Sequence, residues 1–197
     1  MPKILPRKFY AEPTGKLARK LLGCRLVRER RGIRLAGRIV ETEAYIGEKD
    51  LACHAHVGKT PRTRIMYGPP GVCYVYFTYG MHWLLNVVAE EEGFPAAVLI
   101  RALEPLEGLD VMGRLRPGKT ALEFCRGPAK LTRALDIRGE HNGADLCRPG
   151  ASIWIEPAAV GPLRIERTPR IGISRTPEPW RSKPWRFTIK GNHFLSR

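Results

Sequence analysis

Three apolar runs that follow one another closely limit what this chain can fold into more than any other feature of its sequence. Each is rich in β-branched and aromatic residues, a composition that favours strands: VCYVYFTY at 72–79, WLLNVVA at 83–89 and AAVLIRAL at 96–103. Only the short breaks YGMH and EEEGFP separate them. Because connections this short join antiparallel neighbours, we expect successive antiparallel hairpins.

The segments around these runs add further strands and a few helices. The patterns predict strands at 24–29 and 34–45, and apolar residues recur at helical spacing at 106–115 and 128–135. A first helix is expected in GKLARKLL, with Thr14 as its N-cap and Gly23 just past its end.

The two remaining segments read as loop-rich. Residues 46–70 are expected to be mostly loop with a short helix at 48–54, and residues 150–197 to alternate short strands with Pro-rich breaks. We find no repeat and no linker, and 197 residues suffice for one core. The sequence therefore predicts an α+β fold in a single domain over residues 1–197, with a curved, largely antiparallel β-sheet and peripheral helices.

The charge balance points to a polyanionic partner. The chain has 34 Lys and Arg against 19 Asp and Glu, which gives a net charge of +15 and a pI of about 10.1. Such an excess favours nucleic acid, or less often an anionic membrane surface, although a basic ribosomal protein would also fit. No apolar run approaches the roughly 18 residues of a membrane span, and we expect no signal peptide. Five scattered cysteines without a C-x-x-C motif favour reduced thiols in the cytoplasm.

The strand RIVETEAY carries the first candidate catalytic groups. Side chains two apart in a strand share a face, so Ile39, Glu41, Glu43 and Tyr45 are expected on one side of the sheet. A solvated face would explain two carboxylates there as well as a functional site would. If the face is buried, one carboxylate is a candidate acid, base or metal ligand.

The loop at 46–67 carries a concentration of cations. Lys59, Arg62 and Arg64 lie in KTPRTR, whose guanidinium groups and hydroxyls suit phosphate, although a merely solvated loop would have the same composition. His54 and His56 form an H-x-H pair, but no further ligand falls at metal-binding spacing, so we expect no metal site.

The stretch YVYFTYG combines rings with hydroxyl groups. Strand alternation places Tyr74 and Tyr76 on one face, and Phe77 and Tyr79 on the other, with Tyr79 at the turn before Gly80. A protruding ring can wedge into a base stack, and a ring further inward can stack on an extruded base. A tyrosine-rich core strand is the simpler alternative.

With these stretches in place, the chain resembles the human-type alkyladenine, or 3-methyladenine, DNA glycosylases, in a minimal form like that of bacterial relatives. The matching stretches run through most of the chain: GRIVETEAYIGEKDLACHAH, TPRTRIMYGPPGVCYVYFTYGMHWLLNVV, VLIRALEPLEGL, RGPAKLTRAL and KPWRFTI. The resemblance implies a monofunctional DNA N-glycosylase of base excision repair. Such an enzyme flips an alkylated or deaminated purine out of duplex DNA and hydrolyses its N-glycosidic bond with a Glu-activated water, leaving an abasic site.

The resemblance also implies a role for individual residues. Glu43 would be the general base that activates water, and Arg101 would help to hold that water. The damaged base would bind among Tyr45, His54, Tyr76 and Asn86, the last of which would disfavour guanine. Tyr79 would fill the gap left in the duplex, and our candidates for backbone phosphate contacts are Lys59, Arg62, Arg64 and the basic segment 164–190.

The resemblance further implies no metal and no organic cofactor. Its partner would be double-stranded DNA with a damaged purine, bound by a monomer without membrane contact in the cytoplasm, at the nucleoid. We expect the acidic turn at 90–92 to point away from DNA, because its glutamates would repel phosphate.

Two other functions fit parts of the sequence. A non-catalytic nucleic-acid-binding protein would explain the charge and the tyrosines, but not the carboxylates beside them. A sugar hydrolase could use Glu41 and Glu43 as an inverting pair, since residues two apart in a strand are separated by roughly 6.6–7 Å. The basic charge argues against a neutral glycan substrate.

Overall fold

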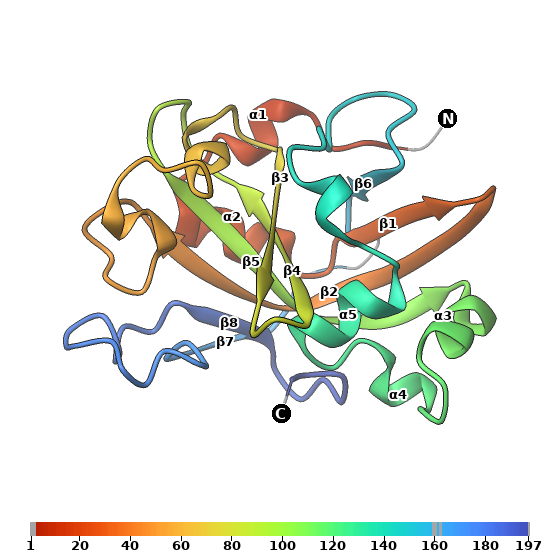
Figure 1. Cartoon of the computed structure of the whole chain (residues 1–197). Coiled ribbons are helices and arrows are strands. Elements are labelled where there is room, and N and C mark those ends of the chain that lie inside the picture. Colours follow the sequence, from red (N-terminus) through yellow and green to blue (C-terminus); the bar gives the residue numbers. More distant parts are fainter. Residues whose placement is uncertain (1–2, 159–160, 162, 197) are drawn as a thin grey trace.

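The chain folds around one antiparallel sheet, as the computed structural model shows for residues 3–158, 161 and 163–196. The sheet has eight strands in the order β3-β4-β5-β2-β1-β6, with β8 paired to β2 and β7 to β8. Figure 1 shows the sheet curving, with short helices at its periphery. The expected α+β class with a curved, largely antiparallel sheet is confirmed.

The strands are β1 (Arg25–Arg30), β2 (Ile33–Ile46), β3 (Cys73–Thr78), β4 (His82–Val88), β5 (Ala96–Glu107), β6 (Ile153–Glu156), β7 (Ile165–Thr168) and β8 (Arg186–Ile189). The α-helices are α1 (Arg7–Tyr10), α2 (Thr14–Leu21), α3 (Leu109–Leu115), α4 (Ala121–Phe124) and α5 (Pro128–Ala134). Three 3-10 turns complete the set: η1 (His54–Val57), η2 (Arg64–Tyr67) and η3 (Gly139–His141). Among the described residues, no helix is long and apolar enough to cross a bilayer.

Strand β2 is the element on which the rest of the sheet is organised. One of its edges pairs with β5 along most of its length. The other edge pairs first with β1 and then, from Glu41 to Glu43, with β8. Two register shifts opposite β5 flank Glu41, and they break the expected alternation. Ile39 therefore packs in the main core with Ala44, and not on the face of Glu43 as predicted.

The two faces of the sheet have different coverings. Alternate residues of β3 and β5, such as Val75 and Val98, join the core formed with α2 and α5. Their neighbours Tyr74 and Ala97 belong to a second, smaller apolar cluster under the loop that precedes β3. The sheet thus has helices packed on one face, and a site can form on the other.

Helix α2 begins one residue earlier than expected, and Thr14 is not its N-cap. Instead, Glu90 from the turn after β4 accepts hydrogen bonds from the backbone N–H of Thr14, at 2.9 Å, and from its hydroxyl. The acceptor at the start of the helix is a carboxylate distant in sequence, so the prediction of Thr14 as N-cap, made from local sequence, was wrong. Gly23 follows the end of the helix with φ of 85°, as its predicted role requires.

Two other predicted helices differ from the structure. Residues 48–53 form turns, and the short helix lies later, at η1. Residues 106–107 end β5, and α3 starts only at Leu109. The prediction at 48–54 is therefore wrong, whereas the second difference lies at a boundary, where apolar spacing alone does not fix the first helical residue.

A buried ion pair fastens the segment after β7 to the end of β2. Arg170 donates to both oxygens of Asp50, at 2.6 and 2.8 Å, and also to the carbonyl of Ala44 at 2.9 Å. Both charged side chains are fully buried. The guanidinium of Arg170 also lies 4.6 Å from the ring centroid of Tyr45 and 5.1 Å from that of Trp185. The loop that follows Arg170 is thereby held over the open face of the sheet.

Replacing Asp50 with Asn should destabilise the protein strongly, because it leaves the buried charge of Arg170 without a carboxylate. Removing one partner of a buried pair costs about 3–5 kcal/mol of unfolding free energy. Equilibrium unfolding in urea measures the loss. The exposed pair of Asp110 and Arg114 provides the control, since Asp110→Asn should cost less than about 1 kcal/mol. An equal effect of the two variants would contradict this account of Asp50.

Replacing Glu90 with Ala should lower the unfolding free energy by about 1 kcal/mol, because α2 then loses the acceptor at its N-terminus. Equilibrium unfolding in urea measures this loss of unfolding free energy. Glu91→Ala, at an exposed neighbouring position, is the matched control and should change stability by less than about 0.5 kcal/mol. If both variants lose the same stability, the cap is not the reason.

Candidate active site

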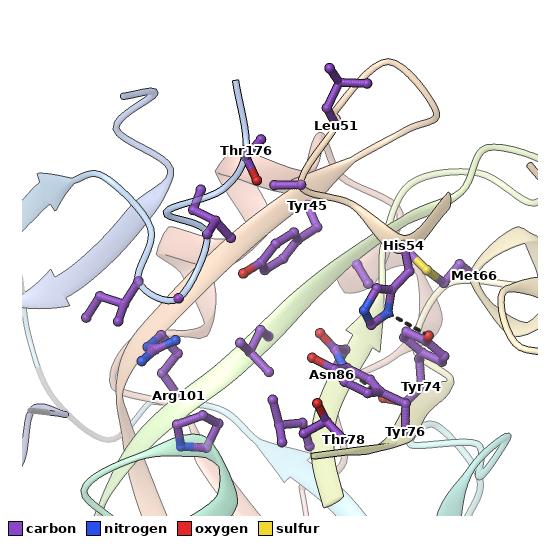
Figure 2. A pocket seen from close by; sticks show the side chains of 18 of the residues that line it. Tyr45, Leu51, His54, Met66, Tyr74, Tyr76, Thr78, Asn86, Arg101 and Thr176 are labelled. Carbon is purple, nitrogen blue, oxygen red and sulfur yellow. Dashed lines mark hydrogen bonds between the residues drawn. The ribbon is translucent and has the colours of Figure 1, made fainter. Parts of the chain in front are cut away.

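A cavity of about 660 Å³ opens on the face of the sheet that the helices leave free. Its walls come from β2, β3, β4 and β5, from the loop at 51–54 and from residues 171–176. Figure 2 shows Tyr45 and Arg101 on one side of it, and His54, Tyr74, Tyr76 and Asn86 on the other. Its size lies in the range of small-molecule sites, so it can admit a flat base.

Glu43 lies behind the wall of this cavity and is fully buried. Its Oε2 accepts hydrogen bonds from the hydroxyl of Tyr45 at 2.8 Å and from Arg101 at 3.3 Å. Its Oε1 accepts one from the backbone N–H of Ile171 at 2.7 Å. Burial raises the pKa of Glu43, while Arg101 and the N–H of Ile171 oppose the rise. These three partners border the cavity, so the carboxylate sits one contact away from it.

Arg101 joins the two carboxylates of β2. It is 7% exposed and donates from Nε to Glu41 at 3.1 Å and from Nη1 to Glu43 at 3.3 Å. The buried carboxylates raise the pKa of Arg101 against the effect of desolvation. Glu41, Glu43 and Tyr45 share one face, as the spacing predicted. Both carboxylates are fully buried and Tyr45 is half-buried, which removes the solvated-face alternative.

The opposite side of the cavity is aromatic. The imidazole of His54 shares a hydrogen bond of 2.9 Å with the hydroxyl of Tyr74 and lies edge-on to Tyr76, with ring centroids 4.5 Å apart (Figure 2). Burial, with the nearby charge of Arg62, lowers the pKa of His54 to about 4. His54 is therefore neutral at physiological pH and adds no positive charge to this wall.

Asn86 stands beside these rings on β4, directly across from Tyr74. Its amide donates to the backbone carbonyl of Tyr74 at 3.1 Å, which fixes the orientation of the side chain. Asn86 is 4% exposed and lines the cavity. A rigid polar group at this position can discriminate between purines by their edge.

Tyr79 occupies the tip of the β3–β4 hairpin and is the most exposed large aromatic or aliphatic side chain of the described residues, at 82%. Its φ of 51° is unusual for a residue other than glycine and turns the chain at the tip. The strand has ended at Thr78, and Tyr79 borders the same cavity as Tyr76. The predicted placement on the opposite face is therefore wrong.

The cations of the loop at 59–64 are exposed beside the cavity. Lys59, Arg62 and Arg64 all face solvent, and the guanidinium of Arg62 lies 5.1 Å from the ring centroid of Tyr76. The basic segment 164–190 was a candidate for phosphate contacts, and two of its arginines are engaged within the fold instead. Arg170 is buried against Asp50, and Arg186 pairs with Glu41. Arg164, Arg167, Arg175, Arg181 and Lys190 remain exposed.

The acidic turn lies at the opposite end of β4 from Tyr79. Glu90 is engaged with α2, while Glu91 and Glu92 are exposed. Among the described residues, no group of three or more His, Cys, Asp and Glu side chains is arranged to hold a metal ion.

Sequence reasoning missed four residues that build the site. Arg170 and Asp50 position the loop, Ile171 donates its N–H to Glu43, and Ser196 donates to Glu41. Each of them contacts a residue more than 100 positions away in the sequence, and Ile171 does so through its backbone N–H. The sequence holds no clear signal for them, since Asp50 follows Glu48 and Lys49 and Arg170 lies in a basic segment.

Comparison with known proteins identifies the family. A family model described as methylpurine-DNA glycosylase matches residues 8–193. A protein of Methanocella arvoryzae is 49% identical over 98% of this chain and 96% of its own length. One of Carboxydothermus hydrogenoformans is 48% identical over 98% and 99%, and one of Chlorobaculum parvum is 50% identical over 91% and 86%. All three are provisionally named 3-methyladenine DNA glycosylases.

The family model covers nearly the whole chain, and the three relatives match 91% to 98% of it. The resemblance seen in the sequence motifs is thereby confirmed, and the chain belongs to the methylpurine-DNA glycosylase family.

Proposed function

We propose that this protein is a monofunctional DNA N-glycosylase that flips an alkylated or deaminated purine out of duplex DNA. It hydrolyses the N-glycosidic bond with a water activated by Glu43 and leaves an abasic site. Family membership makes the chain a DNA repair glycosylase, a hydrolase of N-glycosyl bonds. The observation that carries the mechanism is a buried carboxylate of raised pKa, paired with Arg101, at the wall of an aromatic cavity.

The chemistry of the bond explains why a carboxylate stands there. An N-glycosidic bond breaks through a sugar with oxocarbenium character, so a nearby negative charge stabilises the transition state. Glu43 provides that charge and accepts a proton from the attacking water, and Arg101 helps to hold the water. Because Glu43 is fully buried, it is shielded from bulk solvent, and its charge acts over a short distance at low dielectric.

The aromatic wall suits a base that is electron-poor. Alkylation at N3 or N7 makes a purine cationic and a better leaving group. The rings of Tyr45 and Tyr76 favour such a base through stacking and cation–π attraction. Neutral His54 lets the pocket accept a cation without repulsion, and Asn86 disfavours guanine by crowding its exocyclic amino group.

Search and flipping depend on the exposed parts of the site. A net charge of +15 supports strong, salt-sensitive binding to any duplex. Tyr79 is exposed at the hairpin tip and can fill the gap left by the flipped nucleotide, while Lys59, Arg62 and Arg64 bind backbone phosphates. Flipping costs a few kcal/mol, least at a damaged base, so part of the selectivity arises before the pocket is reached. A monomer acting on nucleoid DNA in the cytoplasm fits this proposal.

Replacing Glu43 with Gln should lower single-turnover base release by at least about 100-fold, the usual contribution of a general base, while lesion binding is retained. The measurement uses duplex oligonucleotides with hypoxanthine or ethenoadenine, together with methylated DNA. Glu156→Gln, which removes a carboxylate paired with Arg34 at a distant strand, is the control and should keep wild-type rates. Full turnover by Glu43→Gln would refute the assignment of the base. Tight DNA binding by a wild type that releases no base would indicate a non-catalytic binding protein.

Replacing Tyr79 with Ala should weaken affinity for lesion duplex by roughly tenfold, because stacking on one base is worth about 1–3 kcal/mol. Binding is measured by fluorescence anisotropy, with the melting temperature recorded in parallel. Since Tyr79 is 82% exposed, its loss should leave the unfolding free energy within about 0.5 kcal/mol of wild type. Ile33→Ala removes another exposed apolar side chain next to the β1–β2 turn and should not change affinity. A large loss of stability would instead mean that Tyr79 is part of the core.

A further inference from the structure

Glu41 accepts four hydrogen bonds, one more than Glu43, and is held more fully by its surroundings. Its Oε1 accepts from Arg101 at 3.1 Å, from Arg186 at 2.7 Å and from the hydroxyl of Ser196 at 2.7 Å. Its Oε2 accepts from the backbone N–H of Ser196 at 2.6 Å. A carboxylate offers about four acceptor sites, and this one has four donors. Both carboxylates are fully buried, but all three donors to Glu43 border the cavity, whereas only Arg101 does so among the donors to Glu41.

The hydroxyl of Ser196 links Glu41 to Arg101 a second time. It donates to Glu41 and accepts from Nη2 of Arg101 at 3.4 Å. All three nitrogens of the Arg101 guanidinium are thus occupied, by Glu41, Glu43 and Ser196. Only one of these contacts is to the proposed base, and the other two fix the plane in which the guanidinium lies.

The segment that carries Ser196 is itself fastened to the fold. Arg126, next to α5, donates to the carbonyl of Leu195 at 3.1 Å. Asn192 donates to Glu104 of β5 at 3.3 Å and accepts from the N–H of Phe194 at 2.8 Å. A segment at the far end of the sequence is therefore held against the back of the cavity wall.

The charges at this place balance. Glu41 and Glu43 face Arg101 and Arg186, two charges of each sign, with little or no exposure to solvent. Without the negative charge of Glu41, Glu43 would be the only carboxylate left to balance the positive charges of Arg101 and Arg186. Glu43 would then be a weaker base, and Arg101 could swing in the plane that Glu41 and Ser196 now define.

We propose that Glu41 is a positioning residue, held by Arg186 and Ser196, that fixes Arg101 against Glu43 and offsets its charge. The inference rests on the proposed function of Glu43. It assigns the residues around Ser196 to the active site, although they lie outside every stretch that carries the chemistry.

The pH dependence of the rate tests this role. Glu43 must be ionised to accept a proton, so the rate rises with pH through its pKa. Five groups face Glu43: Glu41 and Tyr45 on β2, Arg101 on β5, Tyr76 on β3 and the N–H of Ile171. Burial raises the pKa of Glu43 most, and among these groups Glu41 adds to the rise through its negative charge. Removing that charge should lower the pKa, and the rise in rate should begin at lower pH.

The experiment compares wild type, Glu41→Gln and Ser196→Ala in single-turnover base release across pH. Glu41→Gln should shift the acidic limb to lower pH and reduce the plateau rate between about 10- and 100-fold, the range that misplacing a reacting group produces. Affinity for lesion duplex should stay within twofold. Ser196→Ala removes only the hydroxyl and keeps the charge of Glu41, so it should lower the plateau rate by a smaller factor and leave the acidic limb where it is in wild type. It keeps the inference testable if Glu41→Gln does not fold.

Glu156→Gln again serves as the matched control, since it loses an arginine-paired carboxylate far from the cavity. Its pH profile and plateau should equal those of wild type. Unchanged profiles and rates in both Glu41→Gln and Ser196→Ala would overturn the inference while leaving the role of Glu43 intact. If Glu41→Gln yields less folded protein but keeps the pH profile of wild type, then Glu41 has only a structural role.

A second readout does not depend on turnover. Carboxyl-carbon NMR of labelled glutamate follows the ionisation of Glu43, with its signal assigned from Glu43→Gln. A lower pKa in Glu41→Gln than in wild type supports the electrostatic coupling even if no substrate is cleaved. Absence of base release by wild type would therefore count against the proposed function. An NMR pKa of Glu43 that is the same in Glu41→Gln as in wild type would count against the coupling to Glu41.

Discussion

Two carboxylates two residues apart in the middle of β2 are buried from bulk solvent, and the elements around them supply donors. β5 contributes Arg101, β8 contributes Arg186, and the loop after β7 contributes the N–H of Ile171. Buried carboxylates that lack such partners would be protonated or would destabilise the fold. The arrangement of strands around β2 is therefore also the arrangement that keeps these charges in place.

The strands could be predicted because their signal is local. The apolar runs gave β3 and β4 to within one residue at each end, and they gave the start of β5 but not its end at Glu107. The spacing in ETEAY placed Glu41, Glu43 and Tyr45 on one face. The places where prediction failed depend on distant partners. Thr14 looks like a cap, but Glu90 replaces it, and the register shifts beside Glu41 move Ile39 to the other face.

The same distinction applies to the site. Motifs of the family pointed to the cavity residues, and the structure places Tyr45, His54, Tyr76, Asn86 and Arg101 around one space. What motifs did not reveal is how the residues are held. Arg170 looked like one more surface cation in a basic segment, and only the fold shows that it is fully buried against Asp50. Charge counts overestimate the surface available to DNA for this reason.

Strand β2 changes its neighbour halfway along its length, from β1 to β8. The half that pairs with β1 begins at an exposed turn at Arg31 and Gly32, at the other end of this half from the carboxylates. Peptide added at that turn would extend a hairpin whose other strand faces β6, without entering the pairing that surrounds Glu43. The turn is therefore a natural attachment point for a fluorophore or a fused domain, with which the enzyme could be followed as it moves on DNA.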